Sequence, residues 1–329
     1  MRSVPAGSFQ RCTDLPALWR AYRTCRRGKS RQPAMAAFDL DADRHLIALH
    51  RMLREDRYRP DPCRLRVVHD PKTRLIAAPS IRDRVLHRAL LDDIGPTYER
   101  GFIHHSFGAC SGRGPHRAVL QYLRWMRLYG YRMHLDIAGY FPSIRHDILA
   151  GLLNRRLRDR RTRALVVDLL AGGGEVYADP LARRVLGERA PPTPGRGLAL
   201  GSYLSQWCGT FFLDGLDHFV KRELKVGGYL RYQDDMVLFG DDPGLLAAQR
   251  AAVVDWLDRE RNLVLKAGCG EVLSTSQPRV FLGYRVSRAG VSPGRKLRRD
   301  FRRRVRAAAE RGPEALVRTM RAYRGMLTF

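Results

Sequence analysis

Three aspartates have a spacing and surroundings that suit metal-ion chemistry. Asp136 comes late in the predicted strand "HLDIAGYF", and Asp234 and Asp235 are adjacent within "YLRYQDDMVLF". Both stretches are mostly apolar, so a carboxylate there needs a partner. Two Mg²⁺ ions held by shared carboxylates can bind the attacking and the leaving oxygen in phosphoryl transfer. An isolated Asp-Asp pair is, however, also typical of a polar hairpin turn, so the flanking sequence has to decide.

The charge of the chain indicates a polyanionic partner. Among 329 residues there are 60 Lys and Arg against 33 Asp and Glu, a formal net charge of +27. Nucleic acid is the leading partner on this ground and an anionic membrane surface the second. The excess of Arg suits bidentate phosphate contacts. A genomic bias towards Arg would also explain the choice of Arg over Lys, but it explains the nearly twofold excess of bases over acids less easily.

Cysteine usage and hydropathy exclude other classes of protein. The six cysteines are scattered without a CxxC motif, which predicts reduced thiols and neither a disulfide framework nor a zinc site. The N-terminus "MRSVPAGSFQRC" has no apolar core for a signal peptide, and no stretch approaches the length of a membrane span. We therefore expect a cytoplasmic protein.

Local patterns predict the elements that position the aspartates. Apolar residues at helical spacing and alternating, strand-like runs occupy different stretches of the chain. Helices are expected over residues 13–29, 41–57, 81–95, 202–224 and 243–261, strands over 131–141, 263–267 and 280–286, and hairpins over 63–80 and 229–240. The stretch 106–130 is expected to be a Gly-rich basic turn that leads into a further helix. Residues 172–200 are predicted to form a loop or short hairpin, and residues 295–329 a basic amphipathic helix. An antiparallel sheet with helices on one face fits this order.

The flanks of the aspartates resemble the reverse transcriptase family. "YQDD" resembles its YxDD box, and "LDIAGYFPSI" (135–144) resembles its first aspartate motif. Further motifs follow in the order expected for that family. They are "PKTRLIAAPSIRDRVLHRAL" (71–90), "SFGACSGRGPHRAV" (106–119), "GLALGSYLSQ" (197–206) and "FLGYRV" (281–286).

The resemblance implies an α+β fold shaped as a right-hand polymerase with fingers, palm and thumb. The palm would be an antiparallel, RRM-like sheet backed by helices, and the thumb short and helical. The implied ranges are an N-terminal helical extension over 1–40, fingers over 41–132 with 145–200 as a partial fingers or palm insertion, palm over 133–286 and thumb over 287–329.

The resemblance also implies roles for single residues. Asp136, Asp234 and Asp235 would be catalytic and, with the backbone carbonyl of Ile137, would hold two Mg²⁺ ions, for which Mn²⁺ could substitute. The residues expected to bind the incoming dNTP are Lys72, Arg74, Phe141, Leu200, Gly201, Gln206 and Lys266. The expected primer grip comprises Phe281, Leu282, Gly283 and Tyr284, and the expected nucleic-acid contacts are Arg113, Arg298, Arg299, Arg302, Arg303 and Arg306. Phe141 is alternatively ordinary core packing, and Lys266 a solvated charge at the end of a strand.

One departure from the common pattern points to a subgroup. Leu200 stands where many relatives have Gln, and the form "LGxxxSQ" resembles the enzymes of diversity-generating retroelements, which copy a template RNA with frequent errors. That resemblance implies template RNA, a DNA or RNA primer, dNTPs and a small basic helical accessory protein as partners, and no membrane. A phage-defence or retron-type reverse transcriptase is the alternative enzyme. A catalytically silent RNA-binding scaffold and a generic basic RNA-binding protein are alternatives of another class.

Overall fold

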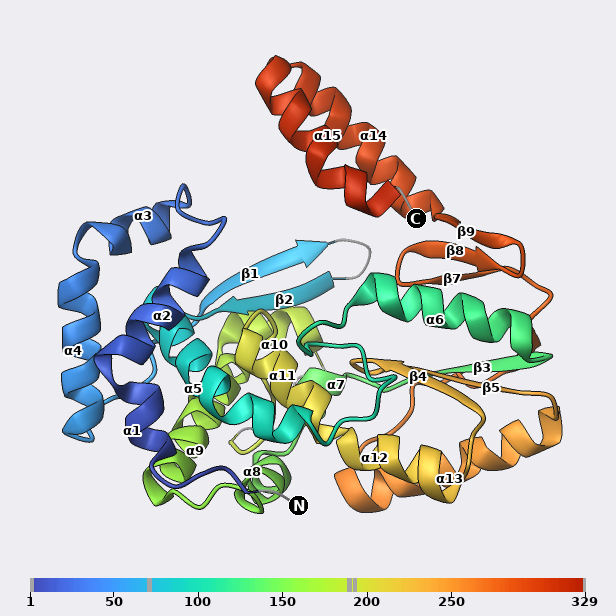
Figure 1. Cartoon of the computed structure of the whole chain (residues 1–329), viewed down its shortest axis with the longest axis horizontal. Helices are drawn as coiled ribbons and strands as arrows, with labels where there is room; N and C mark the ends of the chain where they lie inside the picture. The colour runs from blue at the N-terminus through green and yellow to red at the C-terminus, as the bar shows by residue number, and fades with distance from the viewer. Residues whose placement is uncertain (1–2, 70–72, 188–190, 192–193, 328–329) are drawn as a thin grey trace. The chain divides into compact units, whose positions relative to one another are not determined.

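The chain divides into two compact units, each assembled from separate stretches of sequence (Figure 1). The computed structural model describes residues 3–69, 73–187, 191 and 194–327. Unit 1 comprises Met1–His104, Ile137–His218 and Val254–Leu265, and unit 2 comprises His105–Asp136, Phe219–Val253 and Lys266–Phe329.

Unit 1 is mainly helical and carries one β-hairpin. Its elements are α1 Ser8–Thr13, α2 Leu15–Arg26, α3 Pro33–Leu40, α4 Ala42–Arg54, β1 Arg64–His69, β2 Thr73–Ala78, α5 Ile81–Glu99, α7 Tyr140–Ser143, α8 His146–Asn154, α9 Arg160–Gly174, the 3₁₀ turn η1 Glu175–Ala178, α10 Pro180–Leu186, α11 Tyr203–Phe212 and α12 Asp214–His218. The expected hairpin over 63–80 is confirmed, with Arg64 opposite Ala78 and His69 opposite Thr73.

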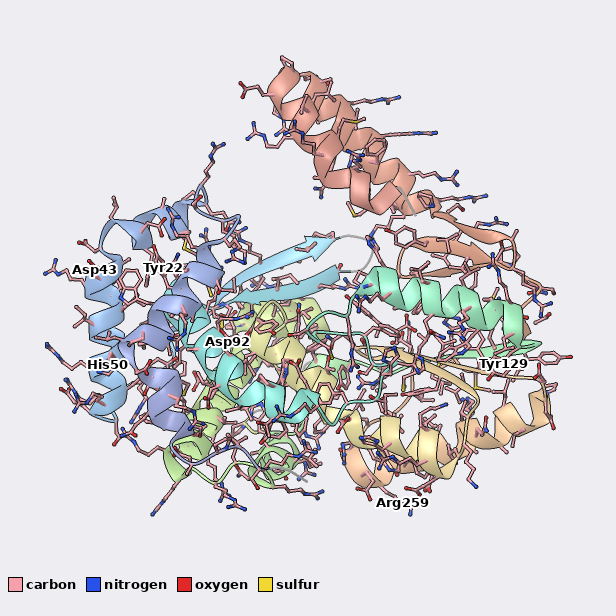
Figure 2. The ribbon with its side chains drawn as sticks, in the orientation of Figure 1. Tyr22, Asp43, His50, Asp92, Tyr129 and Arg259 are labelled. Atoms are coloured by element: carbon pink, nitrogen blue, oxygen red, sulfur yellow. The ribbon has the colours of Figure 1, made fainter. Side chains whose placement is uncertain are left out.

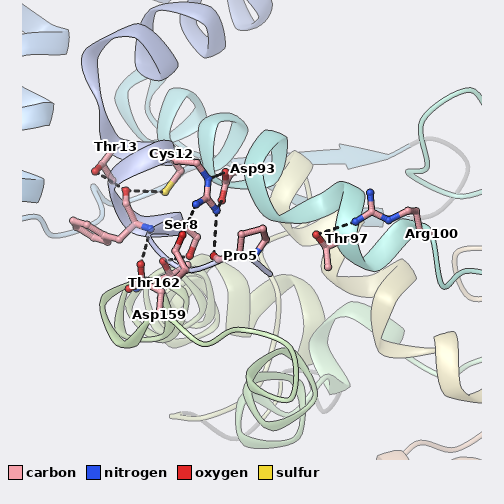
Figure 3. Close-up of polar contacts among 12 residues, drawn as sticks. Pro5, Ser8, Cys12, Thr13, Asp93, Thr97, Arg100, Asp159 and Thr162 are labelled. Atoms are coloured by element: carbon pink, nitrogen blue, oxygen red, sulfur yellow. Dashed lines mark hydrogen bonds and ion pairs between the residues drawn. The ribbon is translucent and has the colours of Figure 1, made fainter. Parts of the chain in front are cut away.

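The single helix expected over 13–29 is two helices. Asp14 separates α1 from α2 because its extended backbone ends α1, while its side chain accepts a hydrogen bond from the Ala17 amide and so caps α2. Polar contacts then fix α1 against α9 and α5 (Figure 3). The Ser8 hydroxyl lies 2.7 Å from that of Thr162, and Arg11 Nε lies 2.7 Å from an Asp93 carboxylate oxygen.

The loop or hairpin expected over 172–200 was wrong for its first half. The helix α9 runs on through Gly172–Gly174, and η1 and α10 follow directly. Glycine costs a helix about 1 kcal/mol per residue. The long apolar face formed by Leu165, Val166, Leu169 and Leu170 is buried and outweighs that cost.

Two further helix predictions needed correction. α5 passes through Pro96 to Glu99, beyond the expected end at residue 95, and the buried Tyr98 ring anchors its last turn. The continuous helix expected over 202–224 is broken into α11, α12 and a π-helical turn, η3 Phe219–Glu223.

Unit 2 is built on an antiparallel sheet. Its elements are α6 Pro115–Leu128, β3 Tyr131–Asp136, η3, β4 Gly228–Tyr232, β5 Asp235–Gly240, the first part of α13 Pro243–Arg261, β6 Val272–Ser274, β7 Arg279–Phe281, β8 Tyr284–Ser287, β9 Gly290–Pro293, α14 Arg295–Ala309 and α15 Pro313–Leu327. Within the described residues, one sheet has the strand order β4-β5-β3-β6 and a second has the order β7-β8-β9. The expected hairpin over 229–240 and helix over 243–261 are confirmed.

Three strand or helix limits differ from expectation. β3 ends at Asp136 rather than at 141, and Tyr140–Ser143 forms the short helix α7. Residues 263–267 make only an isolated bridge, between Leu265 and Ile137, and β6 forms later in the chain. The tail beyond residue 295 is a pair of helices, α14 and α15, because Gly312 and Pro313 end the first helix and begin the second.

The core of unit 2 fastens α6 onto the sheet. Tyr122 from α6 lies fully buried, stacked on Phe281 at 4.7 Å between ring centroids and edge-on to Phe239 at 5.2 Å. Tyr129, labelled in Figure 2, follows α6 and packs beside Gly227 and Gly228 at the start of β4. This packing holds β3, β4 and β5 as a rigid platform for their end residues.

In the part of the chain that the structure describes, no helix is long and apolar enough to cross a membrane.

A buried histidine in unit 1 should make stability pH-dependent. Burial lowers the pKa of His87 to about 4 from its usual 6.5, and its Nδ1 lies 3.3 Å from the Ser202 hydroxyl. The folded state therefore favours the neutral ring, and the unfolded chain takes up a proton first as pH falls. The His87 contribution is complete above pH 6.5 and is lost between pH 6.5 and 4, by at most roughly 3 kcal/mol.

Urea unfolding between pH 7 and 4 should show this loss in the wild-type protein and a smaller loss in His87→Gln. His69→Gln, at an exposed position, is the matched control and should keep the wild-type dependence. An identical pH dependence in His87→Gln and wild type would contradict the prediction.

Candidate active site

The pairing of β3 with β5 brings two of the three aspartates face to face. Asp136 is the last residue of β3 and stands directly opposite Asp235, the first residue of β5. Cβ atoms of such a pair are about 4.5–5.5 Å apart, and like charges in this position repel. The two side chains are 43% and 39% exposed, so solvent or a ligand can reach both. The pair is therefore an open acidic site that calls for a cation.

Lys266 supplies part of the needed positive charge. Its Nζ lies 3.5 Å from an Asp136 carboxylate oxygen, and its amide donates a 2.8 Å hydrogen bond to the Asp136 carbonyl. The Cys269 thiol lies 3.7 Å from the same carbonyl. The segment 266–270 thus runs beside the end of β3 and holds the Asp136 backbone in place. Lys266 is 48% exposed, so this ion pair is a weak one.

Two residues that the sequence reasoning missed support the acidic site. His134 shares a face of β3 with Asp136, and its Nδ1 lies 3.9 Å from an Asp235 oxygen while its Nε2 lies 2.9 Å from the Tyr122 hydroxyl. Arg231 is 1% exposed in β4, and its Nη1 donates a 2.9 Å hydrogen bond to the Gln233 carbonyl. A charged residue inside the apolar run "YLRYQDD" was the available signal for Arg231.

Asp234 lies in the turn between β4 and β5. Gln233, which precedes it, has a φ of 58°, in the left-handed region that non-glycine residues rarely occupy. Asp234 and Asp235 are each partly buried. All three aspartates and Lys266 belong to unit 2.

The carboxylates of Asp136 and Asp235 suit a metal ion that takes its remaining ligands from water or a bound substrate. Among the described residues, no three His, Cys, Asp or Glu side chains gather closely enough to hold a metal by themselves. Mg²⁺ needs only one or two carboxylates, because waters and substrate phosphates supply its remaining oxygens. The facing, exposed carboxylates of Asp136 and Asp235 fit that requirement.

The residues expected to bind the dNTP divide between the two units. Lys266 is in unit 2, and Lys72 lies outside the described residues. Arg74 in β2 and Gln206 in α11 are exposed, and Phe141 in α7 is half-buried. The remaining residues belong to unit 1, as does the expected carbonyl ligand Ile137, which is buried.

Leu200 and Gly201 connect the loop before α11 to the hairpin of unit 1. The Leu200 carbonyl accepts a 2.7 Å hydrogen bond from the Ala77 amide of β2. Gly201 has a φ of 125°, and a Cβ there would lie 2.8 Å from the Ala77 carbonyl oxygen. The backbone at Leu200 is therefore fixed, and Gly201 is required by a close approach.

The expected primer grip forms the β7–β8 hairpin of unit 2. Phe281 and Tyr284 are buried in the core, and the Tyr284 hydroxyl lies 3.0 Å from His116 Nε2. Leu282 is partly exposed and Gly283 is exposed, both with positive φ in the connecting turn. Any direct contact with a primer would therefore come from this turn, which the two buried rings hold in place.

The arginines expected to contact nucleic acid have two different settings. Arg113 is half-buried, and its Nη1 donates a 2.9 Å hydrogen bond to the Ser106 carbonyl. The five expected arginines that lie in α14 are exposed and follow one side of that helix, where they line an open groove with Arg295, Ala307 and Glu310. These five are Arg298, Arg299, Arg302, Arg303 and Arg306.

Comparison with known proteins gives distant similarity. No family model matches the chain. It is 30% identical over 125 residues to Protein YkfC of Escherichia coli, a match that covers 35% of this chain and 32% of that protein. It is 23% identical over 165 residues to the putative COX1/OXI3 intron 2 protein of Saccharomyces cerevisiae, covering 49% of this chain and 18% of that protein. The matched part thus spans less than a third of the length of each curated relative.

Removing one of the facing carboxylates should have opposite effects without and with metal. Asp235→Asn ends the repulsion with Asp136, so we expect the metal-free protein to gain about 0.2–1 kcal/mol in free energy of unfolding. Saturating Mg²⁺ should stabilise the wild type, by about 2.7 kcal/mol at a hundredfold excess over its Kd, and should stabilise Asp235→Asn much less.

Thermal or urea unfolding with and without Mg²⁺ measures both effects. Asp241→Asn, in the same unit but beyond the end of β5, is the control and should respond to Mg²⁺ as the wild type does. An equal response to Mg²⁺ in wild type and Asp235→Asn would contradict metal binding at this pair.

Proposed function

We propose that the chain is an RNA-directed DNA polymerase, a reverse transcriptase that extends a primer on a template RNA with dNTPs. The observation that carries the proposal is the direct cross-strand pairing of Asp136 with Asp235, beside Asp234 in the connecting turn. Weak, distant similarity to a protein named for an intron accords with it. The resemblance of six ordered motifs to the reverse transcriptase family supports it independently.

The proposed roles follow from the chemistry of nucleotidyl transfer. Asp136, Asp234 and Asp235, with the carbonyl of Ile137, would hold two Mg²⁺ ions, which when bound supply charge stabilisation for the attacking and leaving oxygens. The Lys266 ammonium beside Asp136 is well placed to neutralise negative charge that develops near that carboxylate. Arg74, exposed at the start of β2, would bind phosphates of the incoming nucleotide.

The corresponding fold proposal is a right-hand polymerase. The antiparallel β4-β5-β3-β6 sheet would be the core of the palm, the β1–β2 hairpin part of the fingers, and α14 with α15 the thumb. The exposed arginines of α14 would bind the sugar–phosphate backbone of the template and primer. Because such contacts release counterions, the affinity for nucleic acid should fall steeply with salt.

Primer extension tests the proposed activity. The full chain should extend a primer annealed to RNA when dNTPs and Mg²⁺ are supplied, and Asp235→Ala should lose activity by at least about a thousandfold, in keeping with the loss of a charge-stabilising group in a transition state. Asp241→Ala is the matched control and should keep the wild-type rate. Absence of extension by the wild type on every primed RNA tested, with the accessory protein also supplied, would contradict the proposal.

We further propose that the enzyme serves a diversity-generating retroelement and copies its template with frequent errors. The Leu200 backbone is fixed by its hydrogen bond to the Ala77 amide. The resemblance implies that the side chain at this position packs against the incoming nucleotide. A branched apolar Leu cannot donate a hydrogen bond to base or sugar, which removes one polar restraint on selection.

Leu200→Gln should therefore lower misincorporation on an adenine-rich RNA template. A polar restraint that rejects a mismatched partner is worth about 1–3 kcal/mol, so the error frequency should fall roughly tenfold or more. Sequencing of the cDNA products measures it, with Leu200→Met as the apolar control. An unchanged error spectrum in Leu200→Gln would contradict the link between Leu200 and infidelity.

A further inference from the structure

We propose that the segment Ser106–Arg113 and the buried Arg231 together position the turn that carries Asp234 and leads into Asp235, which makes Arg231 and Ser106 positioning residues for the polymerase reaction. The proposal deepens the proposed function and rests on it. All the contacts that carry it lie within unit 2.

The segment before α6 extends the sheet beyond β4. The Arg231 amide donates a 3.0 Å hydrogen bond to the His105 carbonyl, and the Phe107 amide donates a 2.9 Å hydrogen bond to the Arg231 carbonyl. These bonds form a parallel bridge between Ser106 and Arg231. Phe107 is 4% exposed in the core under α6, so the bridge is fixed from the interior as well.

The Arg231 side chain joins this segment to the turn. Its Nη1 donates a 2.9 Å hydrogen bond to the Gln233 carbonyl, and its Nη2 donates a 3.2 Å hydrogen bond to the hydroxyl of Ser106. Arg231 is 1% and Ser106 0% exposed. A guanidinium buried in this way is strongly favoured in the one arrangement that satisfies its donors.

Close packing against Gly108 also restricts the turn. A Cβ at Gly108 would lie 2.8 Å from the Gln233 amide nitrogen, so the segment touches the turn backbone directly. The segment is itself held together, because the Cys110 thiol lies 3.1 Å from the Gly108 carbonyl and Arg113 Nη1 donates to the Ser106 carbonyl. Gln233, held in its left-handed conformation, immediately precedes Asp234.

The consequence for catalysis is geometric. Asp235 is fixed by its place in β5, whereas Asp234 lies in a turn whose course depends on the Gln233 carbonyl and on Gly108. Misplacement of a reacting group by about 1 Å costs about a hundredfold in rate. Loosening the Arg231 contacts should thus lower kcat and leave the KM for dNTP nearly unchanged, since none of these residues is expected to bind the nucleotide.

The experiment compares Arg231→Lys and Ser106→Ala with Arg132→Lys in the full chain. Arg132 is an equally buried arginine of the same sheet, but its Nη1 donates to the Ser274 carbonyl, at the opposite end of β3 from the aspartates. Lysine keeps the charge in both variants and loses the forked geometry. The readouts are kcat and KM in primer extension, the Mn²⁺ affinity of the isolated protein by electron paramagnetic resonance, and hydrogen exchange at residues 232–235.

We expect Arg231→Lys to lower kcat about a hundredfold, to weaken Mn²⁺ binding and to speed exchange at residues 232–235. Ser106→Ala should do the same to a smaller degree, and it decides the matter if Arg231→Lys does not fold. Arg132→Lys should change none of these readouts. Equal effects of Arg231→Lys and Arg132→Lys, or unchanged exchange at residues 232–235 in both Arg231→Lys and Ser106→Ala, would overturn the proposal.

The two proposals fail separately. If the wild type extends no primer, the polymerase function fails. Exchange at residues 232–235 and Mn²⁺ binding still decide whether Arg231 and Ser106 position the turn.

Discussion

The repulsion between Asp136 and Asp235 is the constraint around which unit 2 is organised. Antiparallel pairing places the two carboxylates opposite one another at the end of β3 and the start of β5, where like charges oppose folding. The surrounding sheet is rigid because α6 packs onto it through a dense aromatic core. The carboxylates therefore cannot relax by moving their strands apart, and a cation beside them would lower the repulsion between them.

The neighbouring groups relieve this charge only in part. The Lys266 ammonium stands at one of the two carboxylates, and the Arg231 guanidinium donates hydrogen bonds to the Gln233 carbonyl and to the Ser106 hydroxyl. With a net charge of +27, the chain has enough arginines to neutralise both carboxylates. Instead the exposed arginines line α14. The exposed arginines and the facing carboxylates thus belong to different elements of one unit.

Sequence patterns predicted the elements whose signals are local. The hairpin over 229–240 has a short, mostly apolar run on each side of the polar stretch Gln233–Asp235, and the helix over 243–261 has no internal breaker, so both were found. The low helix propensity of the glycines at 172–174 suggested that α9 ends before them. Burial of the apolar face of α9 overrides that propensity, and burial is a tertiary effect that local patterns do not show. The aspartates were identifiable from motif order, but their pairing register was not. Arg231 and Ser106 were missed because a hydrogen bond between residues 125 positions apart produces no periodic pattern in the sequence.

The left-handed backbone at Gln233 also limits how this stretch can vary among related sequences. Glycine would adopt that conformation freely, and Asn or Asp at modest cost, whereas β-branched residues would be strained and proline could not adopt it at all. Backbone geometry therefore limits which residues can occupy the second position of the stretch "YQDD", whatever that residue contacts. Substitutions there would reflect the shape of the turn first, and only secondarily any ligand of the protein.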